Sequence, residues 1–469
     1  MPPPFSPLFY LPYFPPLLLL FYALLLLRQH RRLPGEPPVL FSPLPFLGSA
    51  LSFGKDPLAF LRAASAALGA SVFTVVLAGE RTTFFSDPAD WPPLLRTSPA
   101  VLRFDTISAD TGAAFGLLPA TKERLFYGEG GRETHAQFAK FLSQPEHLSE
   151  MTARAASHLS SSLAELANSP PFPLVAILSP IVYAASMHAL LEPGHPLCAR
   201  YDLFAAYDKS FPLLVAGAPL AFFPAAKKAL DAMASLLLAS PAGPASACSA
   251  LMRARYELFV DRLSIPLPQN AYSQVPIVWA AAANTVPACI WALLYTLSHP
   301  SAHDAVAAEC RASPAEPDYD AMPVLHSVIM ETLRVESSSI TVRRVAAGGH
   351  VTKAGVQLRG GDRVALFPPL KHFDPELFEE PEEWRWDRFL GEGEKLAKEV
   401  MPFGGGVSYC PGRHFALREI KAFLCAVFKA VDVELVGSAG GVRRDEARVG
   451  LGVNQVRPGD DVLVKVKAL

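Results

Sequence analysis

The pattern of apolar and polar residues divides the chain into an apolar N-terminal run and a long, helix-rich remainder. Almost every residue from Phe9 to Leu27 is apolar. Beyond this run, apolar positions recur mainly with the helical period, which predicts helices. Short runs rich in β-branched and aromatic residues predict strands at Val72–Leu77, Val364–Phe367 and Val462–Val466. We therefore expect a mostly α-helical fold with minor β structure.

The N-terminal run predicts a membrane anchor, because a span of about 20 apolar residues crosses the hydrocarbon core of a bilayer. It is followed at once by a basic cluster of Arg28, His30, Arg31 and Arg32. Such a cluster stays in the cytosol, so the bulk of the protein should face the cytosol too. A cleaved signal peptide would carry its basic residues before the apolar run. Prolines at 12, 15 and 16 interrupt the early turns, which leaves a tilted or partly interfacial helix open.

Three segments follow from this pattern. Residues 1–32 form the anchor and its basic stop, and residues 33–48 form a proline-rich linker. We expect the linker to be stiff and extended, and to hold the globular part off the bilayer. Residues 49–469 contain no charge run, low-complexity tract or repeat that would divide them. This stretch is expected to be one catalytic domain.

Composition and charge narrow the class of protein. Hydrophobic residues make up 51 % of the 469 residues and charged residues 18 %, so a large core can form and bulk disorder is excluded. The 42 Lys and Arg residues are balanced by 44 Asp and Glu residues, which argues against nucleic acid as a partner. The six cysteines form no CxxC pair, so neither a disulfide scaffold nor a structural zinc site is expected.

The most informative stretch is a glycine-rich loop, MPFGGGVSYCPGRHFA, at residues 401–416. It places Cys410 just before an apolar-periodic helix. A thiolate at a helix N-terminus lies among free backbone N–H groups, so it suits axial ligation of haem iron. The glycines would let a flat macrocycle lie directly against the backbone. For this loop alone, a glycine turn beside a buried structural cysteine is the alternative.

With this loop the chain resembles the cytochromes P450. The haem-binding pattern of that family is Phe-x-x-Gly-x-(Arg/His)-x-Cys-x-Gly, and Ser408 departs from it at a position that usually supplies a basic partner to a haem propionate. The resemblance implies haem b, with Cys410 as the axial ligand of the iron. It implies that the cofactor contacts Phe403, Gly404, Gly406, Cys410, Gly412 and Ala416.

Two further motifs fit the family in the correct order. Glu331-Thr332-Leu333-Arg334 matches Glu-x-x-Arg, in which positions i and i+3 share one helix face and can pair. In isolation such a pair is a common surface salt bridge. The stretch from Pro381 to Phe389 is similar to Pro-x-x-Phe-x-Pro-x-Arg-Phe. By this resemblance Arg388 joins Glu331 and Arg334 in a buried structural triad.

The run from Trp279 to Tyr295 resembles the oxygen-binding helix of the family. Small side chains at 280–283 would leave room for dioxygen and substrate. Pro287 cannot donate to the carbonyl four residues earlier, so the helix should kink. The resemblance implies that Thr285 helps to deliver protons, and that Trp279, Ala280 and Ala283 face the substrate. Without the cysteine loop, an apolar core helix with a buried threonine would be the alternative.

Asn284 is the most informative departure from the family pattern. Most monooxygenases of the family carry a carboxylate there, whereas an amide cannot donate a proton by ionising. The string Ala-Asn-Thr-x-Pro-Ala-x-x-Trp nevertheless resembles one branch, the sterol 7α- and 12α-hydroxylases, oxysterol 7α-hydroxylase and prostacyclin synthase. By the same resemblance Arg343 binds a propionate and compensates for Ser408, with Arg344 as the alternative. His135 and Lys140 are loose candidates near the propionates.

The resemblance implies a monooxygenase that hydroxylates a hydrophobic substrate with dioxygen. No flavin or dinucleotide fingerprint is present, so electrons would come from NADPH through a separate membrane-bound reductase. Arg413, Arg418 and Lys421 are candidates for its docking face. A sterol, steroid or terpenoid is the expected substrate, with a fatty acid left open. The expected location is the endoplasmic reticulum membrane, crossed once, with the catalytic domain in the cytosol.

Two rival functions stay open at this point. One is a haem-thiolate isomerase or dehydratase that acts on a lipid peroxide without a reductase. Thr285 counts against it, because such a rearrangement needs no proton relay, but Asn284 keeps it open. The other is a non-catalytic haem protein that binds a lipid or a gas.

Overall fold

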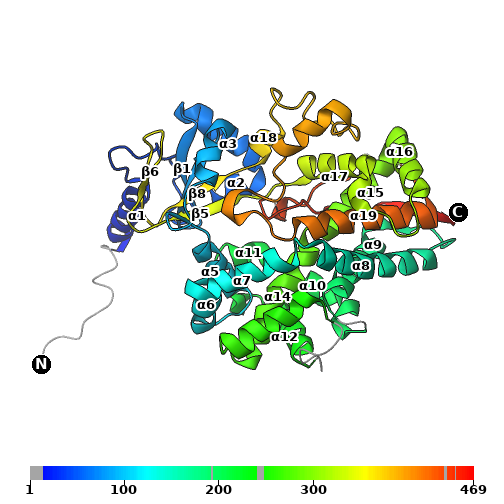
Figure 1. Cartoon of the computed structure of the whole chain (residues 1–469). Coiled ribbons are helices and arrows are strands. Elements are labelled where there is room, and N and C mark those ends of the chain that lie inside the picture. The colour runs from blue at the N-terminus through cyan, green and yellow to red at the C-terminus, as the bar shows by residue number, and fades with distance from the viewer. Residues whose placement is uncertain (1–13, 192–193, 240–247, 438–440, 449) are drawn as a thin grey trace, which may run out of the picture. The chain divides into compact units, whose positions relative to one another are not determined.

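The computed structural model describes residues 14–191, 194–239, 248–437, 441–448 and 450–469. The chain forms two compact units (Figure 1). The first consists of Met1–Arg103 and Val342–Phe367, and the second of Phe104–Thr341 and Pro368–Leu469. Each unit is described by itself. The fold is mostly helical with minor sheet structure, as the sequence predicts.

The first unit contains most of the β structure. Its helices are α1 (Phe14–His30), α2 (Ala50–Lys55), α3 (Pro57–Leu68) and α4 (Trp91–Leu95). Its strands are β1 (Val72–Leu77), β2 (Glu80–Phe85), β3 (Leu102–Arg103), β5 (Thr341–Val345), β6 (His350–Val351), β7 (Gln357–Leu358) and β8 (Arg363–Leu366). Five of these strands form a sheet in the order β1-β2-β8-β5-β3, in which β2 and β8 run parallel.

Strand β1 has the predicted bounds, and β8 lies one residue before the predicted run. Strand β2 was not predicted, because its polar Thr82 and Thr83 do not resemble a buried strand in the sequence. The structure buries both, and the hydroxyl groups of Thr74 and Thr83 hydrogen-bond at 2.8 Å across the β1–β2 pair. A cross-strand bond of this kind lets polar residues occupy core positions.

The proline-rich segment 33–48 is not an extended spacer. It turns back so that residues 42–46 lie against α1, where Tyr22 Oη donates to Pro43 O at 2.6 Å and Ser42 N donates to His30 Nε2 at 3.0 Å. Further along, Gly48 and Leu77 form a β-bridge. The segment is therefore tied to both α1 and β1, which corrects the predicted linker.

The second unit is a helical body with one small sheet. Its helices are α5 (Asp105–Ala114), α6 (Pro119–Phe126), α7 (Gly128–Phe141), α8 (Pro145–Glu165), α9 (Leu174–Leu190), α10 (Tyr201–Asp208), α11 (Phe211–Val215), α12 (Pro224–Ala239), α13 (Ala250–Glu257), α14 (Leu267–Ala283), α15 (Thr285–Ser298), α16 (Pro300–Ala312), α17 (Pro323–Glu336), α18 (Pro369–His372) and α19 (Arg413–Ala430). Its strands are β4 (Phe172–Pro173), β9 (Val431–Leu435) and β10 (Leu463–Ala468), in the order β4-β10-β9.

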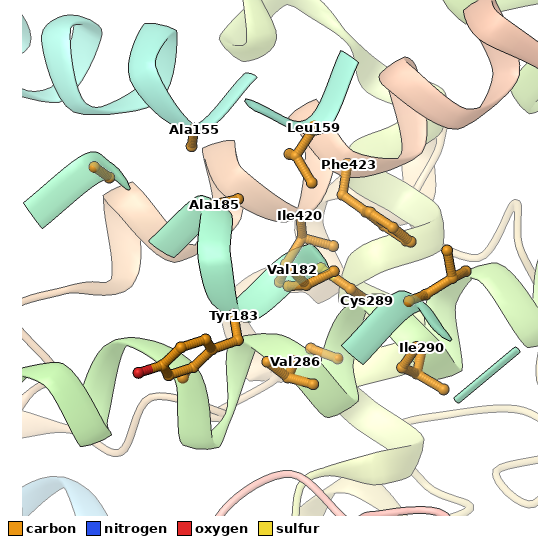
Figure 2. Close-up of a cluster of buried hydrophobic side chains, with 14 of the residues drawn as sticks. Ala155, Leu159, Val182, Tyr183, Ala185, Val286, Cys289, Ile290, Ile420 and Phe423 are labelled. Atoms are coloured by element: carbon orange, nitrogen blue, oxygen red, sulfur yellow. The ribbon is translucent and has the colours of Figure 1, made fainter. Parts of the chain in front are cut away.

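The core of the second unit lies among α8, α9, α15 and α19. Figure 2 shows Leu159, Val182, Cys289, Ile420 and Phe423 from these four helices converging in one cluster. All five side chains are almost completely buried. Because α19 begins just after Cys410, this core fixes the direction in which the cysteine loop enters its helix.

The longest apolar helical run belongs to this core. Among the described residues, Leu267–Ser298 is the helix that is long and apolar enough to cross a membrane, but 78 % of its most apolar window is buried inside the protein. It consists of α14 and α15 and lies in the helical body (Figure 1). The predicted anchor corresponds in part to α1, a shorter apolar helix; residues 9–13 of the predicted span lie outside the described residues.

Candidate active site

The loop before α19 places Cys410 close to the helix N-terminus. Gly404 and Gly406 have φ values of +72° and +65°, a conformation that favours glycine over any residue with a Cβ atom. Cys410 N donates to Phe403 O at 3.0 Å, which closes the loop. Gly412 is the N-cap of α19, and Ala416 N donates to its carbonyl at 2.9 Å. The glycines thus give the backbone the tight path that the sequence predicts.

The electrostatic surroundings of the Cys410 thiol suit a metal ligand. Burial raises the pKa of the thiol above its ordinary value, and the backbone N–H groups of Gly412 and Arg413, together with the Arg413 charge, offset only part of this rise. The N–H groups therefore favour the thiolate, the form that binds iron. Cys410 is half-buried, whereas Cys198, Cys289, Cys310 and Cys425 are buried in the core. A half-buried cysteine whose sulfur accepts from two backbone N–H groups fits the axial ligand of haem.

The predicted triad is assembled in the structure. Both Glu331 and Arg334 are fully buried on α17, and Arg334 Nε and Nη2 donate to the two Glu331 carboxylate oxygens at 2.7 and 2.9 Å. Arg388 Nε donates to Glu331 Oε1 at 3.0 Å. The arginines also bind carbonyl groups: Arg334 Nη1 donates to His372 O and Pro381 O at 2.7 Å. A carboxylate with two guanidinium partners thus ties α17 to the segment that precedes the cysteine loop.

Trp384 belongs to the same region. Its indole N–H donates to Thr332 Oγ1 at 3.2 Å, and its ring stacks on Tyr295 with centroids 5.1 Å apart. It thereby links the triad segment to α15.

The oxygen-binding helix predicted by resemblance is interrupted at Asn284, between α14 and α15. The break lies three residues before Pro287, as expected from the missing N–H of proline. Thr285 is the first residue of α15 and is buried. Ala280 is exposed, whereas Ala283 is buried in the core. Ala280 thus lies on an open face of α14, and the contact of Ala280 and Ala283 with substrate stays a prediction.

The side chain of Asn284 is held by a C-terminal hairpin, which we define as residues 443–448 and 450–457. Val453 N donates to Asn284 Oδ1 at 2.9 Å. Gly452 lies so close that an added Cβ atom would overlap Asn284 Oδ1. Because a backbone N–H can only donate, this contact orients the amide with its oxygen toward the hairpin. The sequence analysis did not foresee this partner, since 169 residues separate Asn284 from Val453.

A buried carboxylate, Glu336 at the end of α17, anchors the same hairpin. Tyr295 Oη donates to Glu336 Oε1 at 2.6 Å, and Arg444 Nε donates to Glu336 Oε2 at 2.8 Å. Asn454 Nδ2 donates to Glu336 Oε2 at 3.1 Å. Nothing in the sequence around Glu336 signals this role, because its partners come from distant segments.

The indole N–H of Trp279 has a hydrogen-bond partner. Its N–H donates to Oδ1 of the buried Asp208 at 2.8 Å. Its ring packs on Phe211 and Phe115, with centroid distances of 4.0 and 5.7 Å. The ring is partly buried, so one part of it remains available for contact.

The two candidate propionate ligands lie in the first unit and point in different directions. Consecutive residues of a strand face opposite sides, and β5 carries Arg343 and Arg344 in this way. Arg344 pairs with Glu80 at 3.1 Å and donates to Gly361 O, so it is already used in the sheet. Arg343 is buried, and burial lowers its pKa to about 10. Arg343 is thus the better candidate of the two, and its role toward haem stays a prediction.

The predicted docking residues differ in accessibility. Lys421 is buried and donates to Tyr319 O at 2.6 Å, so it cannot form part of an exposed docking face. Arg418 pairs with the exposed Asp320. Arg413 lies over the Tyr409 ring, 4.5 Å from its centroid, next to the cysteine loop. Among the other candidates, His135 and Lys140 are exposed on α7.

Comparison with known proteins agrees with this geometry. The family description "Cytochrome P450" matches residues 271–457, which include α15, the triad, the cysteine loop and the C-terminal hairpin. The chain belongs to the cytochrome P450 family and is a P450 monooxygenase by class. The predicted family membership is thereby confirmed.

Its relatives match over nearly the whole chain. Cytochrome P450 7B1 of Mus musculus is 30 % identical, with 89 % of this chain and 88 % of the relative covered. Cytochrome P450 7A1 of Sus scrofa is 30 % identical, with 94 % and 95 % covered. The 7-alpha-hydroxycholest-4-en-3-one 12-alpha-hydroxylase of Oryctolagus cuniculus is 31 % identical, with 94 % and 95 % covered. These relatives place the chain in the sterol hydroxylase branch, as predicted.

Proposed function

We propose that the protein is a haem-thiolate monooxygenase that hydroxylates a sterol or a related steroid or terpenoid. One observation carries this function: Cys410 is half-buried, and its sulfur accepts hydrogen bonds from the backbone N–H groups of Gly412 and Arg413. The relatives named for sterol substrates support the substrate class. Dioxygen and electrons from NADPH, delivered by a separate reductase, complete the proposed reaction.

In this proposal Cys410 holds the iron of haem b through its thiolate. Phe403, Gly404, Gly406, Gly412 and Ala416 would line the cofactor on the same side, and Arg343 would bind a propionate. When bound, haem supplies the oxygen chemistry, and a thiolate ligand increases the electron density that favours O–O cleavage. The buried triad of Glu331, Arg334 and Arg388 keeps the preceding segment in place, so the cysteine loop starts from a fixed point.

The residues at the α14–α15 break have two different proposed tasks. The Thr285 hydroxyl can both accept and donate a hydrogen bond, so it can pass a proton toward the reacting oxygen atoms. The Asn284 amide cannot ionise at neutral pH, and its oxygen is engaged by Val453 N. Asn284 therefore fixes the hairpin and offers its amide N–H groups, while proton transfer depends on Thr285 and water.

The open face of α14 suits an apolar polycyclic substrate. Ala280 has no side chain beyond Cβ and is exposed, and the partly buried Trp279 ring offers a flat apolar surface one residue earlier. A rigid ring system loses little conformational entropy when it lies against such a surface. This favours a sterol over a flexible fatty acid.

The N-terminal region supports attachment to the endoplasmic reticulum membrane through a single span. Apolar side chains on α1 are exposed; Leu19, Phe21 and Leu27 have 68 %, 60 % and 69 % of their surface accessible. Exposed apolar residues at this density are unfavourable in water and favourable in lipid. The basic residues after Leu27 would remain with the catalytic domain in the cytosol. Alkaline carbonate extraction of membranes tests the span: a protein released with the peripheral fraction would contradict it.

Turnover under isotopically labelled dioxygen tests the function. The full-length protein, reconstituted in membranes with NADPH and a P450 reductase, is given a panel of sterols, steroids, terpenoids and fatty acids. A sterol product that carries one labelled oxygen atom is the expected result. Rearrangement of a lipid peroxide without NADPH, and no labelled product, would instead support the isomerase. If a fatty acid becomes labelled and the sterols do not, the proposed monooxygenase activity stands, but the proposed substrate class is wrong.

A further inference from the structure

The indole N–H of Trp279 donates to one member of a buried ion pair, Asp208 with Arg448. Asp208, the last residue of α10, and Arg448 near the tip of the C-terminal hairpin are both almost completely buried. Arg448 Nη2 lies 2.9 Å from the Asp208 carboxylate, and Arg448 Nη1 donates to the Asp208 backbone carbonyl at 2.7 Å. A guanidinium at a helix C-terminus is favourable, because the last carbonyl groups of a helix lack partners within it.

The same carboxylate binds two further donors. Its Oδ1 accepts from Trp279 Nε1 at 2.8 Å, and its Oδ2 accepts from Gln455 Nε2 at 3.1 Å. Asp208 thus joins α10, α14 and the hairpin through one side chain. Charge-assisted bonds of this kind are about twice as strong as neutral ones, so they hold the indole in one orientation.

Packing completes the constraint on the indole. Phe211 stacks on Trp279 at a tilt of 32°, and Phe115 meets it edge-on at 64°. Phe211 follows α10 closely along the chain, so Asp208 fixes one edge of the indole while a neighbouring ring covers its face. The indole has no freedom to rotate unless the Asp208 bond breaks.

We propose that Asp208, held by Arg448, is a positioning residue that fixes Trp279 as a rigid wall of the substrate site and thereby sets the affinity for polycyclic substrates. The proposal rests on the proposed function in one respect, that Trp279 faces the substrate. Asp208 acts through Trp279 and does not itself touch the substrate. The hairpin contributes to the wall only because it carries Arg448 and Gln455.

The decisive variant replaces the pair by apolar groups of similar size, Asp208→Leu with Arg448→Met. Such a replacement of a buried ion pair is often tolerated by folding, whereas removal of one partner leaves an unpaired buried charge. The Trp279 N–H loses its acceptor in this variant. Asp208→Asn is the conservative counterpart: its amide oxygen can face Trp279 and Arg448, and Gln455 can turn its own amide to accept from Asn Nδ2.

The matched control is Asp231→Leu. Asp231 on α12 accepts from Tyr272 Oη at 2.8 Å, so it makes the same kind of aromatic-to-carboxylate bond to α14 about two turns before Trp279. Asp231 differs from Asp208 in two ways: its side chain is exposed, and its cationic partner is a lysine, Lys227. A general effect of loosening α14 would appear in this variant as well.

Two readouts keep this proposal separate from the proposed function. The protein, labelled with 5-fluorotryptophan, gives a fluorine NMR signal for each of its 5 tryptophans, and Trp279→Phe assigns the relevant one. We expect the double variant to shift the Trp279 signal, Asp208→Asn to shift it less, and Asp231→Leu to leave it in place. This readout needs no substrate, so it tests whether Asp208 holds the Trp279 indole even if no sterol binds.

The second readout is the substrate-induced change in the haem spectrum, titrated with each sterol that the wild-type protein binds. The double variant should bind about tenfold more weakly, the loss expected when a fixed contact surface becomes mobile. Asp208→Asn should recover most of the affinity. In the Trp279→Phe background the double variant should cause no further loss. An unmoved Trp279 signal, or equal losses in the double variant and in Asp231→Leu, would overturn the proposal.

Discussion

The backbone N–H of Val453 donates to the side-chain oxygen of Asn284 at 2.9 Å, so the C-terminal hairpin meets the active-site helix at the point where that helix is interrupted. This contact gives a structural reason for an amide at a position where most of the family carries a carboxylate. An amide oxygen can accept from Val453 N without placing a charge at this partly buried position. The Asn284–Val453 contact also makes the neighbouring glycine a sensitive position.

Gly452→Ala should displace the hairpin from Asn284. The added Cβ atom would overlap Asn284 Oδ1, and the φ of +136° is unfavourable for any residue with a side chain. We expect a loss of about 1–3 kcal/mol in the free energy of unfolding, and faster hydrogen exchange at the Val453 amide. Gly459→Ala is the matched control, because Gly459 has a φ of +93° but no neighbour near the added atom. If both variants lose the same free energy of unfolding and show the same increase in hydrogen exchange at the Val453 amide, backbone strain alone explains the effect.

Thr285→Ala should uncouple electron consumption from product formation. The hydroxyl is the one proposed proton-transfer group at the helix break, since Asn284 cannot ionise. With the reconstituted reductase, we expect NADPH consumption to continue while hydrogen peroxide release rises several-fold. Thr296→Ala is the control, because Thr296 lies buried on the same helix and its hydroxyl bonds to Ala292 O. Unchanged coupling in Thr285→Ala would remove this residue from the proton path.

Arg388→Ala should destabilise the protein strongly. The substitution leaves the fully buried Glu331 with one guanidinium partner and removes the Arg388 donor from the carbonyl group of Glu379. Breaking a buried ionic network in this way costs about 3–5 kcal/mol. Urea unfolding of the haem-loaded protein and the haem content after purification measure the loss. Arg385→Ala serves as the control, since Arg385 lies more exposed and pairs with Glu379; an equal effect there would speak against the buried network.

The buried carboxyl group of Glu419 predicts an unusual pH dependence of stability. Burial raises its pKa from 4.5 to about 8, and Ser186 Oγ donates to its Oε1 at 2.7 Å. Among the described residues, its other oxygen has no hydrogen-bond partner. A raised pKa in the folded state means that the group favours folding below about pH 4.5 and loses this contribution as the pH rises toward 8.

Glu419→Gln should remove this dependence, because the amide stays neutral. We expect the variant to resemble the wild type at pH 5 and to be the more stable of the two at pH 8, as measured by urea unfolding. Glu434→Gln is the control, since Glu434 forms an exposed pair with Lys467. Parallel stability curves for the wild type and Glu419→Gln between these pH values would show that Glu419 is ionised in the folded protein.

Sequence patterns predicted the parts of the site that lie on single elements. The glycines before Cys410 and the helix after it are a local matter of backbone freedom, so the loop conformation followed from residues 403–416. Glu331 and Arg334 are one helical turn apart, and the missing N–H of Pro287 breaks the helix wherever it packs. These features depend on the chemistry of a few neighbouring residues.

The sequence alone could not place the contacts that surround those parts. No sequence pattern marks Asp208, Glu336 or Arg448 as a buried charge, and the structure buries all three. Lys421, predicted as part of an exposed face, is buried as well. The segment 33–48, predicted to be extended, turns back on α1 through bonds that no local pattern signals.

Sequence patterns were enough to predict the tight backbone path before Cys410, the pairing of Glu331 with Arg334 and the helix break before Pro287, because each depends on backbone geometry or on side chains within a few positions of one another. The partners that hold Asn284 and Trp279 became visible only in the folded chain, because Val453 and Asp208 lie 169 and 71 residues away along the sequence. A charged side chain is buried only where folding brings its partners to it, and that meeting depends on the packing of the whole second unit.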